Sequence, residues 1–295
     1  MKRLYLIIVC LTLAHGILAQ SKPSKRKKTA SFNKQNSEAE AFLDKQWWLG
    51  FKAGVNLSEV VVTKSYSIVS PTNYSVDNIK KKYKGYDMLG AQATVEITFF
   101  YKGLSLSFQP TYKNVKFGYT NHYEWTDPES TNNYLELNYA QEQSVDYVDF
   151  PLLAKYNVLN RKLKPYVQVG GYITTLVNAT KTLTVSGLDR ASGGENTFEN
   201  EPISVGAKDL FASSHWGLLG GIVLNYNLGN VRLNLDVQYK YGMSNIASTQ
   251  RRNNNNQLSG TGDMLDDMTL NNVSFNLGAL FPLRFLSSGF KSINK

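Results

Sequence analysis

The sequence predicts an all-β protein, an eight-stranded antiparallel transmembrane β-barrel. Apolar and polar residues alternate along eight runs of the chain, and this alternation has the period of a β-strand. Short and long connections alternate strictly between the runs, which places the short turns at one rim of a barrel and the long loops at the other. Charged residues fall opposite the apolar stripes, so the apolar face is expected to meet lipid.

The clearest of these runs form a hairpin over residues 148–177. In its first strand Phe150 and Leu152 share one face, while Asp149 and Lys155 lie on the other. A short basic turn separates this strand from the second one. The alternation predicts that the hairpin supplies the fourth and fifth strands of the barrel.

The other six strands are expected over residues 47–58, 89–99, 104–112, 216–226, 231–241 and 272–281. Near Lys113 to Phe117 the apolar parity of the third strand slips, which predicts a β-bulge. In the sixth strand Leu219 and Val223 oppose the main apolar face. We expect long external loops near residues 63–85, 120–144, 179–214 and 246–271.

Aromatic residues gather toward both predicted rims. They include Trp48, Phe100 and Tyr166 near the short turns, and Phe117 and Tyr147 near the long loops. Transmembrane barrels carry aromatic girdles where the apolar band meets each membrane–water interface. The two groups are therefore interpreted as such girdles.

The first 19 residues have the features of a secretory signal peptide. Lys2 and Arg3 precede an apolar run from Leu4 to Ala14, which is too short to span a bilayer as a helix. We expect cleavage after Ala19. Cys10 is the only cysteine and lies within this run, so the exported chain would hold no thiol for disulfides, metals or nucleophilic catalysis.

Residues 20–46 predict a basic, largely disordered periplasmic arm, because their few apolar side chains cannot offset the entropy of ordering. The arm is either a spacer or a docking segment for an acidic partner or anionic headgroups, through the cluster Lys25, Arg26, Lys27 and Lys28. The barrel is expected over residues 47–285, with a periplasmic tail at 286–295. Because much of the formal charge of +9 lies in the signal and the arm, it does not indicate nucleic-acid binding.

The inward faces of the predicted strands carry seven charged residues, which are Lys52, Glu96, Asp149, Lys155, Arg232, Asp236 and Lys240. A soluble lipocalin-type barrel would bury these charges and expose stripes of Leu and Val. In an eight-stranded membrane barrel the lumen has room only for side chains, so we expect the charges to pair and fill it as a structural network. A selective conduit is the alternative, and it needs a wider barrel or a gap in this packing.

No catalytic, cofactor or metal site is predicted. A Ser-His-Asp arrangement could be drawn through His215 and Ser213, but adjacency in sequence is not triad geometry, and His215 and His122 are interpreted as interfacial or loop residues. A run with Asp263, Asp266 and Asp267 could ligate calcium, but it lacks the order of an EF-hand.

Six segments of the predicted strands stand out, and they read WWLGFKAGVNLS, VDFPLLAKY, KPYVQVGGY, WGLLGGIVLNY, VQYKYGMSNI and NNVSFNLGALFPL. Together they resemble the PorT-like outer-membrane barrels of Bacteroidetes, grouped as β-barrel domain proteins. The resemblance implies a barrel with short periplasmic turns and long extracellular loops in the cell outer membrane. Some members look like accessory components of type IX secretion and gliding machinery, which act in assembly or docking.

Two function hypotheses follow. The first is a non-enzymatic outer-membrane anchor or docking subunit of a type IX secretion or gliding complex, in contact with lipid and, through the arm and the short-turn rim, with a periplasmic protein. The second is a surface-binding protein or adhesin whose extracellular loops bind a ligand. Neither hypothesis involves a cofactor or a nucleic acid.

Overall fold

The computed structural model describes residues 45–66, 80–159, 162–228, 231–252 and 264–283. The predicted signal peptide, the basic cluster of the arm and the tail at 286–295 lie outside these residues. Two residues assigned to the arm, Lys45 and Gln46, already belong to the first strand. Within the described ranges, no helix has the length and apolar character needed to cross a membrane.

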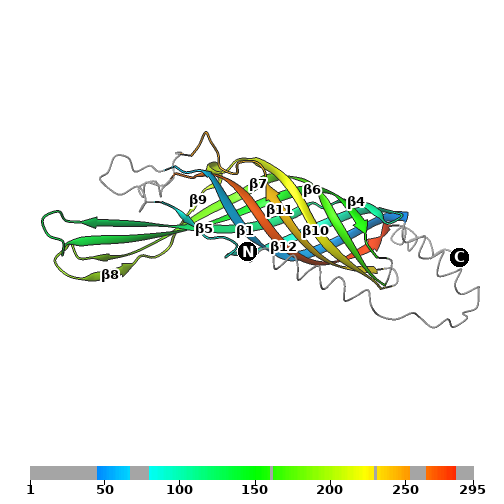
Figure 1. Cartoon of the computed structure of the whole chain (residues 1–295), viewed down its shortest axis with the longest axis horizontal. Coiled ribbons are helices and arrows are strands. Elements are labelled where there is room, and N and C mark those ends of the chain that lie inside the picture. Colours follow the sequence, from blue (N-terminus) through cyan, green and yellow to red (C-terminus); the bar gives the residue numbers. More distant parts are fainter. Residues whose placement is uncertain (1–44, 67–79, 160–161, 229–230, 253–263, 284–295) are drawn as a thin grey trace, which may run out of the picture. The chain divides into compact units, whose positions relative to one another are not determined.

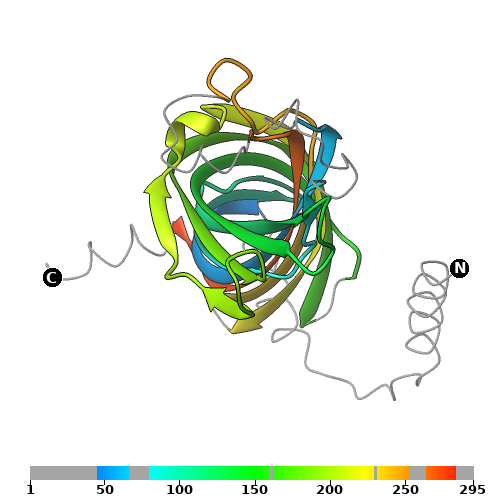
Figure 2. The ribbon, with the colours of Figure 1, turned by 90° about the vertical axis from the view of Figure 1, so that its left-hand side faces the viewer.

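Eight antiparallel strands close into a ring, as predicted (Figures 1 and 2). The ring runs in chain order and closes where β12 pairs with β1. Its strands are β1 (Lys45–Lys64), β3 (Leu89–Tyr101), β4 (Leu104–Phe108) continued by β5 (Thr111–Thr126), β6 (Tyr134–Asn157), β7 (Leu163–Asp189), β10 (Ser214–Leu228), β11 (Val231–Gly242) and β12 (Asp267–Pro282).

The third strand of the ring keeps one register across its interruption at Pro110. Ile97 of β3 pairs with Phe108 of β4, and Thr94 pairs with Thr111 of β5, so no residue is inserted between them. Proline has no N–H to donate, which accounts for the break in the ladder. The bulge predicted near Lys113 to Phe117 is therefore wrong: every second residue stays buried there, and only the lining changes from polar to apolar.

A bulge does occur at another position, between β6 and β7. Asp146 pairs with Asn178 and Tyr147 pairs with Leu176, which leaves Val177 as the extra residue of β7. A bulge of this kind increases the local twist of a strand. The bulge lies just past the last pair between β7 and β10, Thr175 with Ser214, where β6 and β7 begin to extend beyond the ring.

The two faces of the ring have opposite chemistry. The outer face exposes apolar side chains, with Leu277 of β12 65% and Val169 of β7 63% exposed, while Glu96 and Asp236 inside are fully buried. Only a lipid solvent makes this distribution favourable, because in water the apolar side chains would fill the interior. The soluble lipocalin-type alternative does not fit this arrangement.

Three strands of the ring continue past the barrel and extend the same sheet beyond it (Figure 1). β5, β6 and β7 stay paired as far as Trp125, Leu135 and Asp189, and β8 (Asn196–Glu199) and β9 (Ile203–Gly206) pair with β7. β2 (Lys82–Tyr83) pairs with Tyr119 and Thr120 in the middle of β5. We call residues 120–146 and 178–206 the distal sheet. Two of the connections expected as loops, 120–144 and 179–214, are thus built largely of strand.

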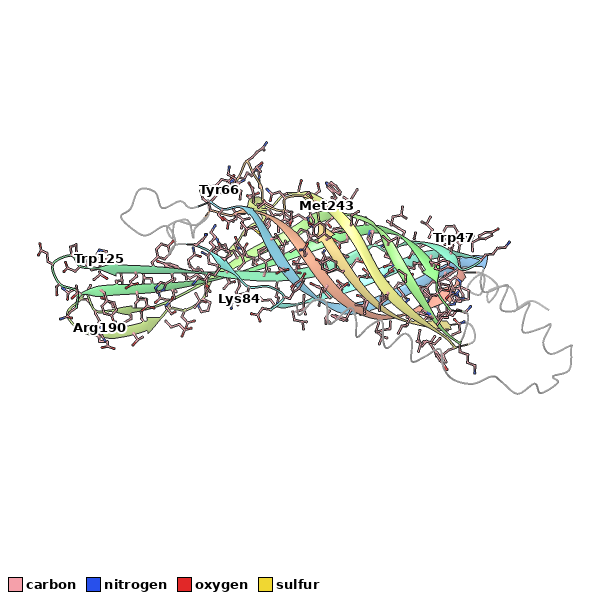
Figure 3. All side chains as sticks on the ribbon, in the orientation of Figure 1. Trp47, Tyr66, Lys84, Trp125, Arg190 and Met243 are labelled. Atoms are coloured by element: carbon pink, nitrogen blue, oxygen red, sulfur yellow. The ribbon has the colours of Figure 1, made fainter. Side chains whose placement is uncertain are left out.

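The distal sheet lies at the long-loop rim. Figure 3 shows Trp125 and Arg190 at its far end and Trp47 at the opposite end of the barrel. The turn between β3 and β4 lies at the opposite, short-turn rim.

The β3–β4 turn yields a stability prediction, because Lys102 (φ 47°) and Gly103 (φ 88°) both adopt the left-handed backbone conformation. A side chain at such a φ costs about 1–2 kcal/mol, so Gly103→Ala should lower the temperature at which the folded band disappears on SDS gels. Gly194→Ala is the matched control, since its added Cβ would meet nothing within 4 Å. Equal shifts in both variants would contradict the prediction.

Candidate functional site

A first group of buried charges joins four strands across the middle of the lumen. Lys52 Nζ of β1 lies 2.9 Å from Glu96 Oε2 of β3 and 2.5 Å from Asp236 Oδ2 of β11. Lys155 Nζ of β6 lies 2.5 Å from Glu96 Oε1. All four side chains are buried, so each charge depends on these partners instead of on water.

A second group centres on Asp149 of β6. Its Oδ2 atom lies 2.9 Å from Lys113 Nζ of β5 and 2.6 Å from Lys240 Nζ of β11, while the Thr174 hydroxyl of β7 donates to Oδ1 at 2.7 Å. One carboxylate therefore pairs with two ammonium groups from different strands, and the group keeps a formal charge of +1. Charge-assisted bonds of this length are the strong ones among protein hydrogen bonds.

Uncharged polar side chains fill the space around the charges. Gln109 accepts from Lys52 Nζ and from the Gln238 amide, each at 3.0 Å, and donates to the Ser107 hydroxyl at 3.0 Å. The Gln168 amide donates to Asp236 Oδ1 at 2.6 Å. These amides connect the charged residues to neighbouring strands and occupy the lumen between them.

Six of the seven charged residues expected inside lie in these two groups, and Arg232 lies elsewhere. Its guanidinium is 4.1 Å from the ring centroid of Trp48 and 4.5 Å from that of Phe100, where it can form cation–π contacts. Lys113 is the charged member that sequence reasoning missed, because it fell in the supposed bulge. Lys113 lies four residues after the inward-facing Gln109, and this even spacing along a strand would have placed its side chain inside.

The short-turn end of the lumen is closed by a buried apolar cluster, which we call the short-turn plug. It consists of Trp48, Phe100, Tyr166, Val223 and Leu280. Three of these residues were predicted to form part of the aromatic girdle at the lipid interface, and that prediction is wrong for them. They share the inward parity of the buried charges, whereas Trp47 on the other parity is 52% exposed.

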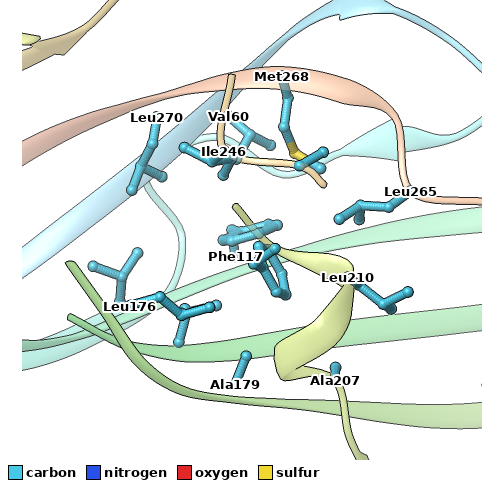
Figure 4. Packing of buried hydrophobic residues seen from close by; sticks show 14 of the residues in the cluster. Val60, Phe117, Leu176, Ala179, Ala207, Leu210, Ile246, Leu265, Met268 and Leu270 are labelled. Carbon is cyan, nitrogen blue, oxygen red and sulfur yellow. The ribbon is translucent and has the colours of Figure 1, made fainter. Parts of the chain in front are cut away.

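A larger buried cluster, the long-loop plug, closes the other end (Figure 4). Inward residues of the strands, such as Phe117 and Leu176, meet Leu210, Phe211 and Ile246 from the connections that fold over the mouth. The short 3₁₀ helix η2 (Lys208–Leu210) supplies Leu210. The described part of the lumen is thus lined by polar side chains in its middle, and a buried apolar cluster lies at each end.

His215 lies inside the barrel, so the expectation of an interfacial or loop position is wrong. It is 3% exposed, and its ring meets the Tyr147 ring edge-on at 4.9 Å between centroids. Neither ring nitrogen has a hydrogen-bond partner among the described residues, Ser213 included. The arrangement does not form a Ser-His-Asp triad. His122 lies on β5 in the distal sheet, where Nδ1 is 2.8 Å from Asn138 Oδ1.

The aspartates considered for calcium are held by protein donors. Asp266 accepts from the Tyr83 hydroxyl at 2.8 Å and lies 3.1 Å from Lys81 Nζ, while Asp267 lies 2.6 Å from Arg252 Nη2. Asp263 falls outside the described residues. In the part of the chain that the structure describes, no group of three or more His, Cys, Asp or Glu side chains could hold a metal ion.

The distal sheet has an apolar inner face and a polar outer face. The inner face continues the lumen side and carries Tyr123, Leu137, Tyr139, Val185 and Phe198. The outer face continues the lipid-facing side, where glutamate, threonine and asparagine replace the Leu and Val of the barrel. This change of chemistry marks where the outer surface leaves lipid for water.

Two turns at the end of the distal sheet hold ionised carboxylates. The Ser192 hydroxyl and the Ala191 N–H both donate to Asp189 at 2.8 Å and lower the pKa of its carboxyl group. The Glu129 N–H donates to Asp127 at 2.9 Å with the same effect on the pKa of that group. Both aspartates are therefore charged at neutral pH.

Comparison with known families agrees with this architecture. Residues 19–248 match the family described as Outer membrane protein beta-barrel domain. The chain belongs to this family. Membership places the protein in the outer membrane, with the apolar outer face of the ring in lipid. No curated protein matches the chain.

Solved structures of other outer-membrane barrels are similar to this family member in fold. Neisserial surface protein A is 11% identical, covers 79% of this chain and 96% of its own, and has a TM-score of 0.29. Ail, the attachment invasion locus protein of Yersinia pestis, is 10% identical in its complex with sucrose octasulfate, covers 80% and 99%, and has a TM-score of 0.24. The translocator domain of autotransporter NalP from Neisseria meningitidis is 10% identical, covers 85% and 96%, and has a TM-score of 0.24. Such low identities do not indicate what this chain binds.

The ion network yields a prediction for unfolding in detergent micelles. Asp149→Asn leaves the ammonium groups of Lys113 and Lys240 buried without a carboxylate, so the free energy of unfolding by urea should fall by about 3–5 kcal/mol. Asp146→Asn on the same strand is the control, because Asp146 accepts only a bond from Asn114 Nδ2 at 2.7 Å and should cost about 1 kcal/mol. Similar small losses in both variants would count against the network.

The closed lumen yields a second prediction. Purified protein reconstituted in planar bilayers should give no steady single-channel current, because apolar side chains fill both ends and ions lose their hydration there. The matched test is a variant with Trp48→Ala and Phe100→Ala in the short-turn plug, which should still show no steady current because the long-loop plug remains. Regular conductance steps from the wild-type protein would refute the closed lumen.

Proposed function

We propose that this protein is a non-enzymatic outer-membrane anchor that presents the distal sheet to macromolecular partners outside the cell. One observation carries the proposal. Side chains fill the described lumen, with a buried apolar cluster at each end, while three of the eight barrel strands continue past the rim as a paired sheet. A transport function would need the lumen, and here side chains occupy it. Among the described residues, the distal sheet is the part that extends past the barrel as paired strands.

The architecture suits display. β6 and β7 are each continuous from the periplasmic side of the barrel to the far part of the distal sheet, with bounds Tyr134–Asn157 and Leu163–Asp189. A site on a continuous strand is held more rigidly than one on a loop. The barrel therefore fixes the orientation of the sheet relative to the membrane.

A periplasmic role is compatible with display and forms the finer part of the proposal. The resemblance to PorT-like barrels supports a docking subunit of a type IX secretion or gliding complex, and the cluster Lys25, Arg26, Lys27 and Lys28 would supply the contact with an acidic protein.

Deleting the distal sheet tests display. The register pairs Thr120 with Ala140 and Thr182 with Ser204, so an Asn-Gly turn can replace residues 121–139 and another can replace residues 183–203. The shortened protein should still fold, because every strand pair of the barrel remains. It should lose its extracellular partners in affinity capture from intact cells after surface cross-linking.

A matched variant that lacks residues 20–44 serves as the control in the same capture. It should keep the extracellular partners and lose the periplasmic ones. Partner sets that do not change when the distal sheet is removed would refute display. Partner sets that do not change when the arm is removed would refute docking through the arm.

A further inference from the structure

The distal sheet concentrates negative charge on a basic chain. Residues 120–146 hold six Asp or Glu and no Lys or Arg, and residues 178–206 hold four Asp or Glu against two basic residues. The sheet therefore carries a formal charge of −8, while the whole chain carries +9. Such an asymmetry creates a local field that attracts cationic partners and repels anionic ones.

The strand register places five of the ten acidic residues on the outer face, which are Glu124, Glu136, Glu142, Asp146 and Glu199. Glu124 and Glu136 are direct partners across β5 and β6, and Glu199 of β8 pairs with Ser186 of β7 beside them. Like charges directly opposite each other in a sheet destabilise it. His122 Nδ1 lies 3.8 Å from Glu136 and compensates this carboxylate only when the histidine is protonated. A cation brought by a partner would relieve the repulsion.

A surface pocket of about 520 Å³ lies among these groups. The carboxylates of Glu136 and Glu199 line it, together with the polar side chains of Asn138 and Ser186 and the apolar side chain of Leu188. Lys and Arg side chains combine an apolar stem with a cationic head, which is the chemistry that this lining complements.

The far end of the same face already holds an arginine of the protein itself. The Arg190 guanidinium lies 5.1 Å from the Tyr134 ring centroid, and its Nη2 atom is 2.5 Å from Glu195 Oε2. An aromatic ring and a carboxylate together bind a guanidinium through cation–π and charge-assisted contacts. Within its own chain, the face thus shows the kind of contact that a partner's arginine would make.

We propose that the outer face of the distal sheet is the docking surface for a basic polypeptide segment, with a Lys or Arg side chain in the pocket between Glu136 and Glu199. This inference rests on the proposed display function and names the chemistry of the partner. Polyanions such as sulfated glycans do not fit, because a charge of −8 repels them. The strand register supplies the geometry, since it fixes the carboxylates on one face.

The test uses the full-length protein in detergent micelles and a fluorescent oligo-arginine peptide, with an oligo-glutamate peptide of the same length for comparison. The wild-type protein should bind only the cationic peptide, and binding should weaken as NaCl rises above about 0.15 M because salt screens exposed charges. The triple variant Glu124→Gln, Glu136→Gln and Glu199→Gln should raise the dissociation constant about tenfold or more.

A charge-matched triple variant separates a defined face from net charge alone. Asp127→Asn, Glu129→Gln and Glu201→Gln remove the same number of charges from the connections of the distal sheet and should change the dissociation constant by less than about threefold. Ser186→Lys places a cation of the protein beside Glu199 and should weaken peptide binding as the first triple variant does. Retained heat-modifiable mobility on SDS gels shows that each variant is folded.

Three results would overturn the inference: no binding of oligo-arginine by the wild-type protein, equal loss in both triple variants, or unchanged binding by Ser186→Lys. If the sheet deletion abolishes partner capture while the first triple variant retains it, the basic docking surface is refuted and display stands. If neither affects capture, both proposals are refuted.

Discussion

The structure depends on pairing charges inside a space that water does not fill. Moving an isolated ammonium or carboxylate out of water costs several kcal/mol, so each buried charge needs partners with the right geometry. Here the partners come from different strands: Lys52 joins β1 to β3 and β11, and Asp149 joins β6 to β5, β7 and β11. A one-residue slip in any of these strands would turn its charge toward lipid. The network therefore specifies the register as well as filling the lumen.

The plugs at the two ends make this pairing effective. Apolar side chains at both mouths keep the polar middle away from bulk water, which strengthens the electrostatic attraction between the pairs. In the proposed function, the filled lumen makes the barrel a mount, and the binding surface lies on the strands that continue past the rim.

The alternation of apolar and polar residues predicted the barrel and most of its interior. In a strand, successive side chains point to opposite faces, so assigning one residue to the lumen assigns its neighbours as well. The same rule would have placed Trp48 with Lys52 and Phe100 with Glu96, but their aromatic character favoured the lipid interface. Alternation cannot tell which inward charges meet. That depends on the stagger between strands, so the pairing of Lys155 with Glu96 could be seen only in the structure. The distal sheet was missed because, outside lipid, neither of its faces needs a continuous apolar stripe.

The length of β7 has a consequence for where binding takes place. From Asn178 to Asp189, at about 3.3 Å per residue, the strand covers about 40 Å beyond the bulge at Val177. Headgroup electrostatics fall off within a Debye length of about 8 Å at physiological salt. A strand of this length can carry the end of the sheet several Debye lengths past the rim of the barrel. A cationic protein could meet it there without first being captured by the anionic lipids below.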